Sequence, residues 1–275
     1  MIEKAQGCLV GLFCGDALGS SVEFMTEREI KSNHPNGVRE MEGGGPFERL
    51  LQEGQITDDG EMAIALARSI VEANKAGPGV GYSPDMARNH YLRWRDTSPF
   101  GMGRTTRKAL GGTPQPESQA NGALMRCAPL GIFCAPQPQW IMSWAENDAC
   151  ITHVNPVCVR ANQLFVGALA VAIRHDATPE KIHKAVKVAA EMIDAPVKLR
   201  EVLDKASHEP PLDYQENMGW VVTAFHNAFF QLLNAPSLEE GLVDTVRRGG
   251  DTDTNAAIAG AFSSTALCCF TPTVR

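Results

Sequence analysis

The sequence predicts an all-α protein. Apolar residues recur at the three- and four-residue spacing of amphipathic helices along most of the chain, and few stretches show the alternation of apolar and polar residues that a half-buried strand needs. The breaks between these segments are short, at Gly77-Pro78-Gly79, Ala135-Pro136-Gln137-Pro138 and Glu209-Pro210-Pro211. No flexible linker or charge run divides the chain, so we expect one domain over residues 1–275.

The first predicted helix carries Gly7, Gly11, Gly15 and Gly19 at four-residue spacing. This leaves one face without side chains and predicts that another helix approaches closely. Acidic residues and Thr open the second and the last helix, as is typical of helix N-termini. The predicted helices are, in order, 3–20, 59–75, 84–96, 104–111, 121–133, 139–148, 155–175, 179–193, 197–206, 218–233, 238–247 and 253–269.

Composition narrows the classes of partner. The net charge of -7 disfavours nucleic acid, which is bound mainly through clustered Lys and Arg. The N-terminus shows no signal peptide, and no run approaches the ~20 apolar residues of a membrane span. We therefore expect a cytoplasmic monomer with no membrane partner. Its eight Cys include no C-x-x-C pair and are expected to be reduced core thiols rather than disulfides or zinc ligands.

Two acidic clusters, Thr57-Asp58-Asp59 and Asp251-Thr252-Asp253-Thr254, are the strongest chemical signal. Each directly precedes an apolar helical pattern. Independent helix caps would account for one acid per helix, because one side-chain oxygen satisfies a free N–H of the first turn. Four carboxylates brought together would instead repel one another unless cations neutralised them. Mg²⁺ or Mn²⁺, which prefer oxygen ligands, are the natural counter-ions, so a paired metal site is the favoured interpretation.

Several further motifs occur in a fixed order from residue 5 to about 270. They are Gly7–Gly11, Gly15–Gly19 with Glu23, Gly43–Phe47, Thr57–Asp59, Ser118–Arg126, Thr152–Pro156 and Gly249–Asn255. With these motifs the chain resembles the ADP-ribosylglycohydrolases, the group that includes the dinitrogenase-reductase-activating glycohydrolases. The resemblance implies a compact orthogonal helix bundle and a hydrolase that cleaves the bond between ADP-ribose and a modified protein side chain.

The resemblance also implies a centre of two Mg²⁺ or Mn²⁺ ions at the base of a cleft. The matching metal-ligand positions are Thr57, Asp58, Asp59, Asp251, Asp253 and Thr254. The ions would hold the ribose hydroxyls and polarise a water. Carboxylates near the anomeric carbon, of which Asp58, Asp59 and Asp253 are candidates, would stabilise an oxocarbenium-like transition state. Glu23 matches a mobile acidic residue of the family and is a candidate for acid/base or gating work; a solvated surface Glu is the alternative.

Ligand-binding positions follow from the same resemblance. They are Gly44, Gly45, Gly101, Gly103, Ser118, Gln119, Asn121, Gly122, His153 and Trp220. Ser118–Gly122 opens an apparent helix, whose free N–H groups can bind a diphosphate, although a simple Ser or Asn cap fits as well. Gly43–Phe47 is expected to be a loop, as a lip over the cleft or a plain surface turn. Trp220 can stack on adenine or be an ordinary buried Trp.

The chain departs from the family pattern at Gly101, where an acidic residue is common, and at Arg104, which adds a cation. An arginine acceptor would be repelled by that cation, so arginine linkage stays the first choice with reduced weight. Gly60, where Thr or Ser is common, is a milder departure. ADP-ribosyl-serine, another acceptor, a small ADP-ribose derivative and a non-catalytic ADP-ribose-binding role are the alternatives.

Overall fold

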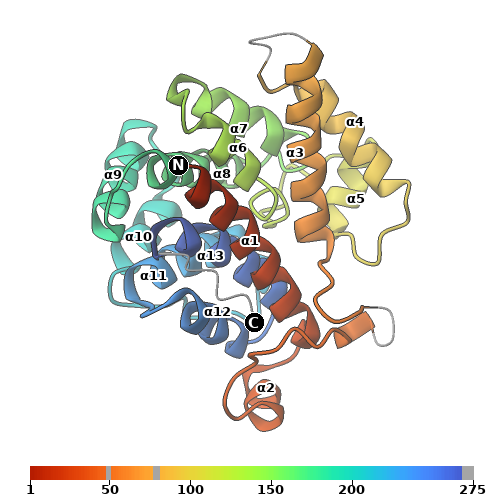
Figure 1. The fold of residues 1–275 in the computed structure, drawn as a ribbon, viewed down its shortest axis with the longest axis vertical. Coiled ribbons are helices and arrows are strands. Elements are labelled where there is room, and N and C mark those ends of the chain that lie inside the picture. The colour runs from red at the N-terminus through yellow and green to blue at the C-terminus, as the bar shows by residue number, and fades with distance from the viewer. Residues whose placement is uncertain (48–50, 77–80, 268–275) are drawn as a thin grey trace.

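The computed structural model describes residues 1–47, 51–76 and 81–267, and this part of the chain is α-helical with two isolated β-bridges. The predicted fold class is therefore confirmed. Three short 3₁₀ helices, η1 (Ser20–Val22), η2 (Gly45–Phe47) and η3 (Pro138–Trp140), join the longer ones (Figure 1). The α-helices are α1 (Ile2–Gly19), α2 (Glu27–Asn33), α3 (Asp58–Ala76), α4 (Pro84–Arg95), α5 (Arg104–Leu110), α6 (Ala128–Cys134), α7 (Ile141–Cys150), α8 (Pro156–Arg174), α9 (Pro179–Met192), α10 (Val197–Lys205), α11 (Val221–Asn234), α12 (Leu238–Arg247) and α13 (Thr252–Leu267).

The centre of the fold is the antiparallel pair α1 and α13, with α11 and α12 packed on the other sides of α13. The glycine strip of α1 faces α13, as predicted. A Cβ atom at Gly11 would lie 2.3 Å from the carbonyl oxygen of Gly260, and one at Gly15 would lie 2.2 Å from that of Ala256. Since real Cβ atoms do not approach so closely, glycine is required here, and the start of α13 is fixed against the end of α1.

The beginning of α3 meets the same end of α1. The backbone N–H groups of Thr57 and Gly60 both donate to the carboxylate of Asp16, which lies in the last turn of α1. From that point α3 runs outward beside α4, away from α13 (Figure 1). The three helix ends that carry acidic residues therefore converge, although the segments are far apart in sequence.

Helix α8 is the main core helix on the other side of the molecule, where α6, α7 and α9 pack against it. It lies within the predicted segment 155–175, but it is more apolar than the sequence analysis allowed, because by length and composition alone it could cross a membrane. However, 78% of its most apolar window is buried by the rest of the chain. Its apolar character is thus accounted for by its place in the core.

Two sequence predictions of local structure were wrong. Residues 27–33 form α2, which was not predicted, although Thr26 and Glu29 make a reciprocal capping box whose T-x-x-E spacing is visible in the sequence. The helix predicted over 121–133 begins only at Ala128, because Asn121–Arg126 form a series of turns. The N–H of Asn121 donates to the carbonyl of Gly219, so this segment is fixed by tertiary contacts.

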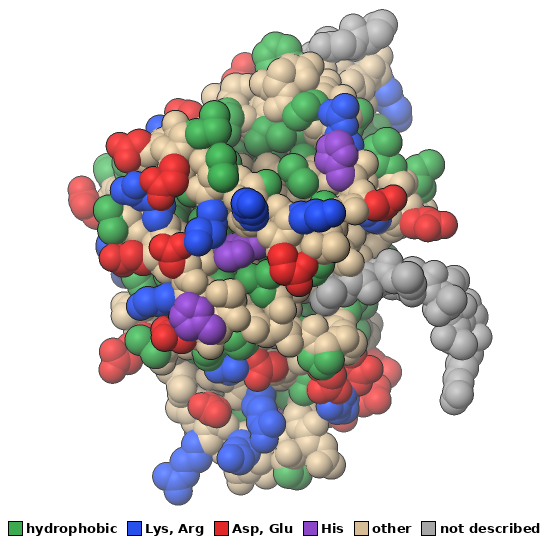
Figure 2. All heavy atoms as spheres, turned by 90° about the vertical axis from the view of Figure 1, so that its left-hand side faces the viewer, with side chains coloured by type: hydrophobic (Ala, Val, Ile, Leu, Met, Phe, Trp, Pro, Cys, Tyr) green, Lys and Arg blue, Asp and Glu red, His purple; other side chains and the backbone are tan. Residues whose placement is uncertain are grey.

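Six Cys among the described residues are unpaired thiols, as expected: Cys8, Cys14, Cys127, Cys134, Cys150 and Cys158. The expected core position is wrong for Cys150, which is exposed, and Cys14 is only half-buried. Cys268 and Cys269, the last residues of the predicted helix 253–269 and the predicted break at 77–79 lie outside the described residues. On the face that carries α9 and α10, acidic and basic side chains are intermingled (Figure 2).

Candidate functional site

Five carboxylates from four segments meet where α1, α3 and α13 converge. Oxygen atoms of Asp16, Asp59 and Asp253 lie within 4.8 Å of one another, and so do those of Glu23, Asp251 and Asp253. Asp253 belongs to both groups, which are therefore adjacent. The two sequence clusters thus form one site rather than two independent helix caps.

The first arm of the site is held by Asp16, which the sequence analysis did not include among the site residues. Its Oδ1 accepts from the hydroxyl of Thr57 at 2.8 Å, and its Oδ2 accepts from the N–H of Gly60 at 2.9 Å. The Thr57 hydroxyl also lies 3.1 Å from Asp59 Oδ2. An acid in the apolar pattern of residues 8–18 was the available signal, because a buried charge in such a helix needs polar partners.

The second arm is the turn before α13. Gly249 and Gly250 have φ angles of +75° and +77°, and the carbonyl of Gly250 accepts from the N–H of Phe24 at 2.8 Å. This contact holds the segment that carries Glu23 beside Asp251. The side-chain amide of Asn121 donates to Asp251 Oδ2 at 2.6 Å. The loop at Asn121, the Glu23 segment and the start of α13 are therefore one connected assembly.

Burial and mutual repulsion dominate the electrostatics. Burial, and then the neighbouring Asp251, Asp58 and Asp16, raise the pKa of Glu23 to about 8. Burial raises the pKa of Asp16 to about 7 and that of Asp58 to about 6. Asp59 and Asp253 have pKa values well above the ordinary range, again first from burial and then from adjacent carboxylates.

The donor set fits a hard divalent cation. Asp59 Oδ1 is buried without a hydrogen-bond partner, so one lone-pair site of the cluster points at no protein donor. The other candidate ligands are also oxygen atoms, from carboxylates and the hydroxyls of Thr57 and Thr254. Such a set favours Mg²⁺ or Mn²⁺ over metals that prefer sulfur or imidazole. A cation bound here would remove the repulsion that raises these pKa values.

A cleft of about 580 Å³ opens above the carboxylates. Its walls come from the Glu23 segment, the loop before α5, the loop before α6, the turn at His153 and the segment before α11. Most of the predicted site residues line it, namely Glu23, Asp58, Asp59, Gly101, Gly103, Ser118, Asn121, Gly122, His153, Asp251, Asp253 and Thr254.

The chain matches the family model described as ADP-ribosylglycohydrolase over residues 1–266. This chain belongs to the ADP-ribosylglycohydrolase family. It is 32% identical to the ADP-ribosyl-[dinitrogen reductase] glycohydrolase of Rhodospirillum rubrum, over 94% of this chain and 83% of that protein. It is 27% identical to the ADP-ribosylarginine hydrolase Tri1 of Serratia proteamaculans, over 94% of this chain and 70% of that protein.

A solved structure described as an ADP-ribosylglycohydrolase-related protein complex superposes with a TM-score of 0.80 at 30% identity, covering 96% of this chain and 87% of that one. Sequence and structural comparisons therefore agree on the family. Its named members are hydrolases that act on glycosidic bonds, so this ADP-ribosylglycohydrolase is an enzyme of that kind.

Five predicted positions do not line the cleft of this ADP-ribosylglycohydrolase: Thr57, Gly44, Gly45, Gln119 and Trp220. Thr57 is buried against Asp16. Gln119 and Trp220 line an adjoining open hollow of about 480 Å³, which shares Ala120, Met218 and Gly219 with the cleft. There the indole N–H of Trp220 donates to Gln119 Oε1 at 2.9 Å. Gly44 and Gly45 lie in a tight turn with φ angles of +78° and +67°. A Cβ at Gly45 would lie 2.0 Å from the carbonyl oxygen of Ser20, so this glycine is required by chain packing.

The helix start predicted at Ser118–Gly122, on which the diphosphate-binding interpretation was based, is wrong, because no helix begins there. Ala120 and Trp220 form a β-bridge, and the carbonyl of Gln119 accepts from the N–H of Val221. The Ser118 hydroxyl lies 2.7 Å from that of Thr105 on α5. The segment still borders the cleft, but through turns and side chains rather than through a helix N-terminus.

Two of the departures from the family pattern, Gly101 and Arg104, line the cleft, whereas Gly60 does not. The N–H of Gly103 donates to Asp58 Oδ2 at 3.4 Å, which ties the loop before α5 to the carboxylates. Arg104 begins α5, is exposed and lines the same cleft. Gly60 is buried, and its N–H reaches Asp16. A cation therefore stands at the mouth of an acidic cleft.

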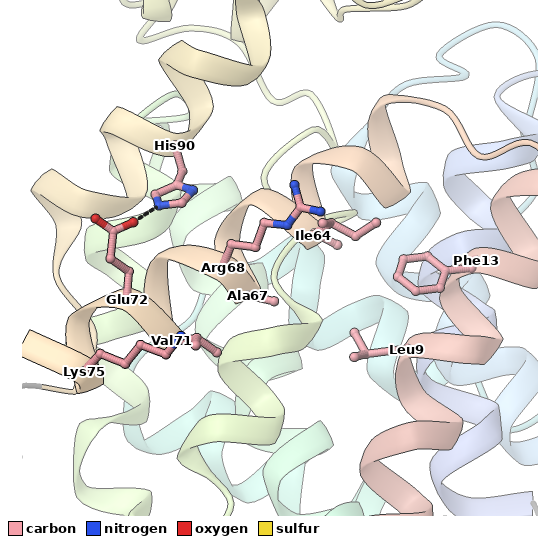
Figure 3. A pocket seen from close by; sticks show the side chains of 10 residues that line it. Leu9, Phe13, Ile64, Ala67, Arg68, Val71, Glu72, Lys75 and His90 are labelled. Carbon is pink, nitrogen blue, oxygen red and sulfur yellow. Dashed lines mark hydrogen bonds and ion pairs between the residues drawn. The ribbon is translucent and has the colours of Figure 1, made fainter. Parts of the chain in front are cut away.

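A second hollow, of about 520 Å³, lies between α1 and α3 (Figure 3). Leu9, Phe13, Ile64 and Val71 form its apolar surface, and His90 pairs with Glu72 at its edge at 2.7 Å. The carboxylate cluster contributes no residue to it. The chemistry expected of the family therefore belongs to the acidic cleft.

Proposed function

We propose that this ADP-ribosylglycohydrolase is a metal-dependent enzyme that cleaves the N- or O-glycosidic bond between ADP-ribose and a modified protein side chain, reversing mono-ADP-ribosylation. Arginine is the first-choice acceptor. The observation that carries the proposal is the convergence of carboxylates at the floor of a cleft large enough for a nucleotide sugar. Asp59 lies in one group of oxygen atoms within 4.8 Å of one another, Glu23 and Asp251 lie in a second such group, and Asp253 belongs to both.

Two Mg²⁺ or Mn²⁺ ions fit the two adjacent oxygen groups that share Asp253. Thr57, Asp58, Asp59, Asp251, Asp253 and Thr254 would hold them. Bound there, the ions would supply positive charge that orients the ribose hydroxyls and polarises water. Without cations, burial and repulsion raise the pKa values of Asp58, Asp59 and Asp253, so these carboxyls hold protons more readily than ordinary ones.

Glu23 is the acid/base candidate. Among the described residues its carboxylate accepts no hydrogen bond, whereas Asp16 and Asp251 are tied to donors. It lines the cleft, and its pKa of about 8 lies near neutral pH. A general acid with such a pKa can donate a proton to the leaving atom of the acceptor and later accept one from water. The remaining carboxylates stabilise positive charge that develops at the anomeric carbon.

The position of Arg104 favours acceptors without a positive charge. Its exposed guanidinium stands on the rim where the acceptor side chain would leave, so an arginine acceptor would meet a like charge. ADP-ribosyl-serine or a small ADP-ribose ester carries no such charge. These substrates are the alternatives to the arginine linkage, and a non-catalytic ADP-ribose-binding role is the alternative from another class.

The deciding experiment measures release of free ADP-ribose from an arginine-modified protein, a serine-modified peptide and a small ADP-ribose ester, each with Mg²⁺, Mn²⁺ or a chelator. We expect release that the chelator abolishes. Release that persists in chelator would contradict metal dependence. Absence of release from all three substrates, with ADP-ribose still bound, would replace the hydrolase with a binding protein.

A further inference from the structure

His153 lies in the turn between α7 and α8 and is 1% exposed, yet it lines the cleft. Its backbone is fixed, because its N–H donates to the carbonyl of Ala149 at 2.7 Å. The two ring nitrogens have different surroundings. Nδ1 lies 2.8 Å from the hydroxyl of Thr152. Nε2 lies beside Gly122 on the cleft wall and has no hydrogen-bond partner among the described residues.

A buried ion pair lies behind Thr152. Arg126 donates through Nε to Asp148 Oδ2 at 3.1 Å and through Nη2 to the carbonyl of Asp148 at 2.8 Å. The guanidinium also lies 4.3 Å from the centre of the Tyr91 ring, and the hydroxyl of Tyr91 donates to Asp148 Oδ1. These contacts leave Nη1 directed at the Thr152 hydroxyl, to which it donates at 2.8 Å.

The direction of each hydrogen bond follows from the donors available. A guanidinium can only donate, whereas a Thr hydroxyl has one hydrogen to give. If Nδ1 carried the ring proton, Arg126 and His153 would both donate to Thr152. Its own hydrogen would then have no acceptor, although Thr152 is 0% exposed. If Nδ1 is bare, the hydroxyl donates to it, and both Thr152 and Nδ1 are satisfied.

We propose that the relay from Arg126 through Thr152 fixes the neutral His153 tautomer that carries its proton on Nε2, so that the ring presents an N–H donor to an acceptor oxygen of the ligand in the cleft. Thr152 and Arg126 are then positioning residues, which act through His153. The identity of the ligand as an ADP-ribose derivative rests on the proposed function; the tautomer does not.

The charge state of the ring agrees with this arrangement. Burial, and then the charge of Arg126, lower the pKa of His153 to about 3, so the ring is neutral across the physiological range. A neutral ring has one donor and one acceptor nitrogen, and the hydrogen bond at one of them decides the role of the other. The hydrogen bond that Nδ1 accepts from Thr152 therefore makes Nε2, on the cleft side of the ring, a hydrogen-bond donor.

The test compares Thr152→Val, which keeps the shape and removes the hydroxyl, with Thr152→Ser, which keeps the hydroxyl. Long-range ¹H–¹⁵N NMR spectra of protein labelled at His report the tautomer, and a His153→Gln variant assigns the signal. We expect the Nε2–H tautomer in the wild type and in Thr152→Ser, and a mixture of tautomers in Thr152→Val. ADP-ribose affinity should fall about tenfold in Thr152→Val and stay unchanged in Thr152→Ser.

A second variant leaves the hydrogen bonds from Arg126 through Thr152 to His153 intact and instead blocks access to the Nε2–H donor. A Cβ at Gly122 would lie 3.2 Å from Nε2, so Gly122→Ala should weaken ADP-ribose binding and keep the wild-type tautomer. The Nδ1–H form in the wild type, or an unchanged spectrum in Thr152→Val, would overturn the proposal. Loss of the proposed function would appear separately, as wild-type protein that neither binds ADP-ribose nor releases it while the spectrum still identifies the tautomer.

Discussion

The carboxylate cluster at the starts of α3 and α13 and the Arg126–Asp148 pair behind His153 are both buried, yet only the pair contains its own counter-charge. In the pair, each of the three guanidinium nitrogens of Arg126 donates to a protein partner. In the cluster, like charges face one another and Asp59 Oδ1 has no partner. Buried charge that the protein satisfies fixes structure, whereas buried charge that it leaves unsatisfied indicates a site for an external ion.

Removing charge from the cluster should have the largest effect on activity and little on folding. Asp253→Asn should lower hydrolysis by at least about 10³-fold, about 4 kcal/mol of activation free energy, because Asp253 belongs to both oxygen groups. Helical circular dichroism should be unchanged. Glu201→Gln on the exposed surface of α10 is the control and should keep full activity. Unfolding of Asp253→Asn would show that the carboxylate is structural.

Removing one charge from the Arg126–Asp148 pair should lower stability rather than activity. Arg126→Met leaves Asp148 buried without its ion-pair partner, which should lower the free energy of unfolding by about 3–5 kcal/mol. Urea unfolding followed by circular dichroism measures this loss. The double variant Arg126→Met, Asp148→Asn should recover part of it, because it removes the uncompensated charge. A single variant as stable as the wild type would remove the contrast between the two regions.

Within the cluster, Glu23 should differ from the carboxylates that hydrogen bonds tether. Glu23→Gln should lower turnover about 10²-fold or more, while ADP-ribose affinity changes by less than about threefold. Turnover under saturating substrate and calorimetric ADP-ribose binding separate the two effects. Equal losses in both would mean that Glu23 contributes binding and not acid/base chemistry.

The smallest expected effect is the pH dependence of stability. The folded pKa values of Asp58, Asp16 and Glu23, at about 6, 7 and 8, lie above their ordinary values. These groups therefore contribute stability that is fully present below about pH 4 and falls as the pH rises through the folded pKa values, until it is lost above about pH 8. In chelator, the free energy of unfolding should fall by more than about 2 kcal/mol between about pH 5.5 and pH 8.5.

Magnesium should oppose this loss, because it binds the deprotonated cluster and its affinity rises with pH. Urea midpoints at about pH 5.5 and pH 8.5, with and without Mg²⁺, test the prediction. The Glu23→Gln protein is the matched control, and its midpoint in chelator should depend less on pH. Equal pH dependence in both proteins would exclude Glu23 from the effect.

Much of the fold was predictable because helical periodicity is a local property of the sequence. The segments 84–96, 179–193 and 238–247 were placed within one residue of α4, α9 and α12. The glycine strip of α1 also predicted its close contact with another helix. The segment at Asn121 was mispredicted because its turns depend on hydrogen bonds to Gly219 and Asp251, about 100 residues or more along the chain.

The site was predictable where residue type alone limits the chemistry. Paired acids at two helix starts pointed to a metal site, and both clusters meet in the structure. Asp16 was missed because an acid inside a helix has no distinctive spacing. The relay behind His153 was missed because the sequence gives no sign that Arg126 and Thr152 would meet. Side chains that act through a third residue are recognised only from their hydrogen bonds.

The sequence by itself determined the helical class, the acidic residues and the family, because each depends on residue types at short range or in a fixed order. Only the tertiary structure decided which carboxylates meet in one cluster, which nitrogen of His153 faces the cleft and which predicted positions lie outside the cleft. Those features depend on distances of a few ångströms between segments up to about 240 residues apart, such as Asp16 and Asp253. Such distances are set by how the helices pack, and α1 and α13 pack closely because glycine allows it.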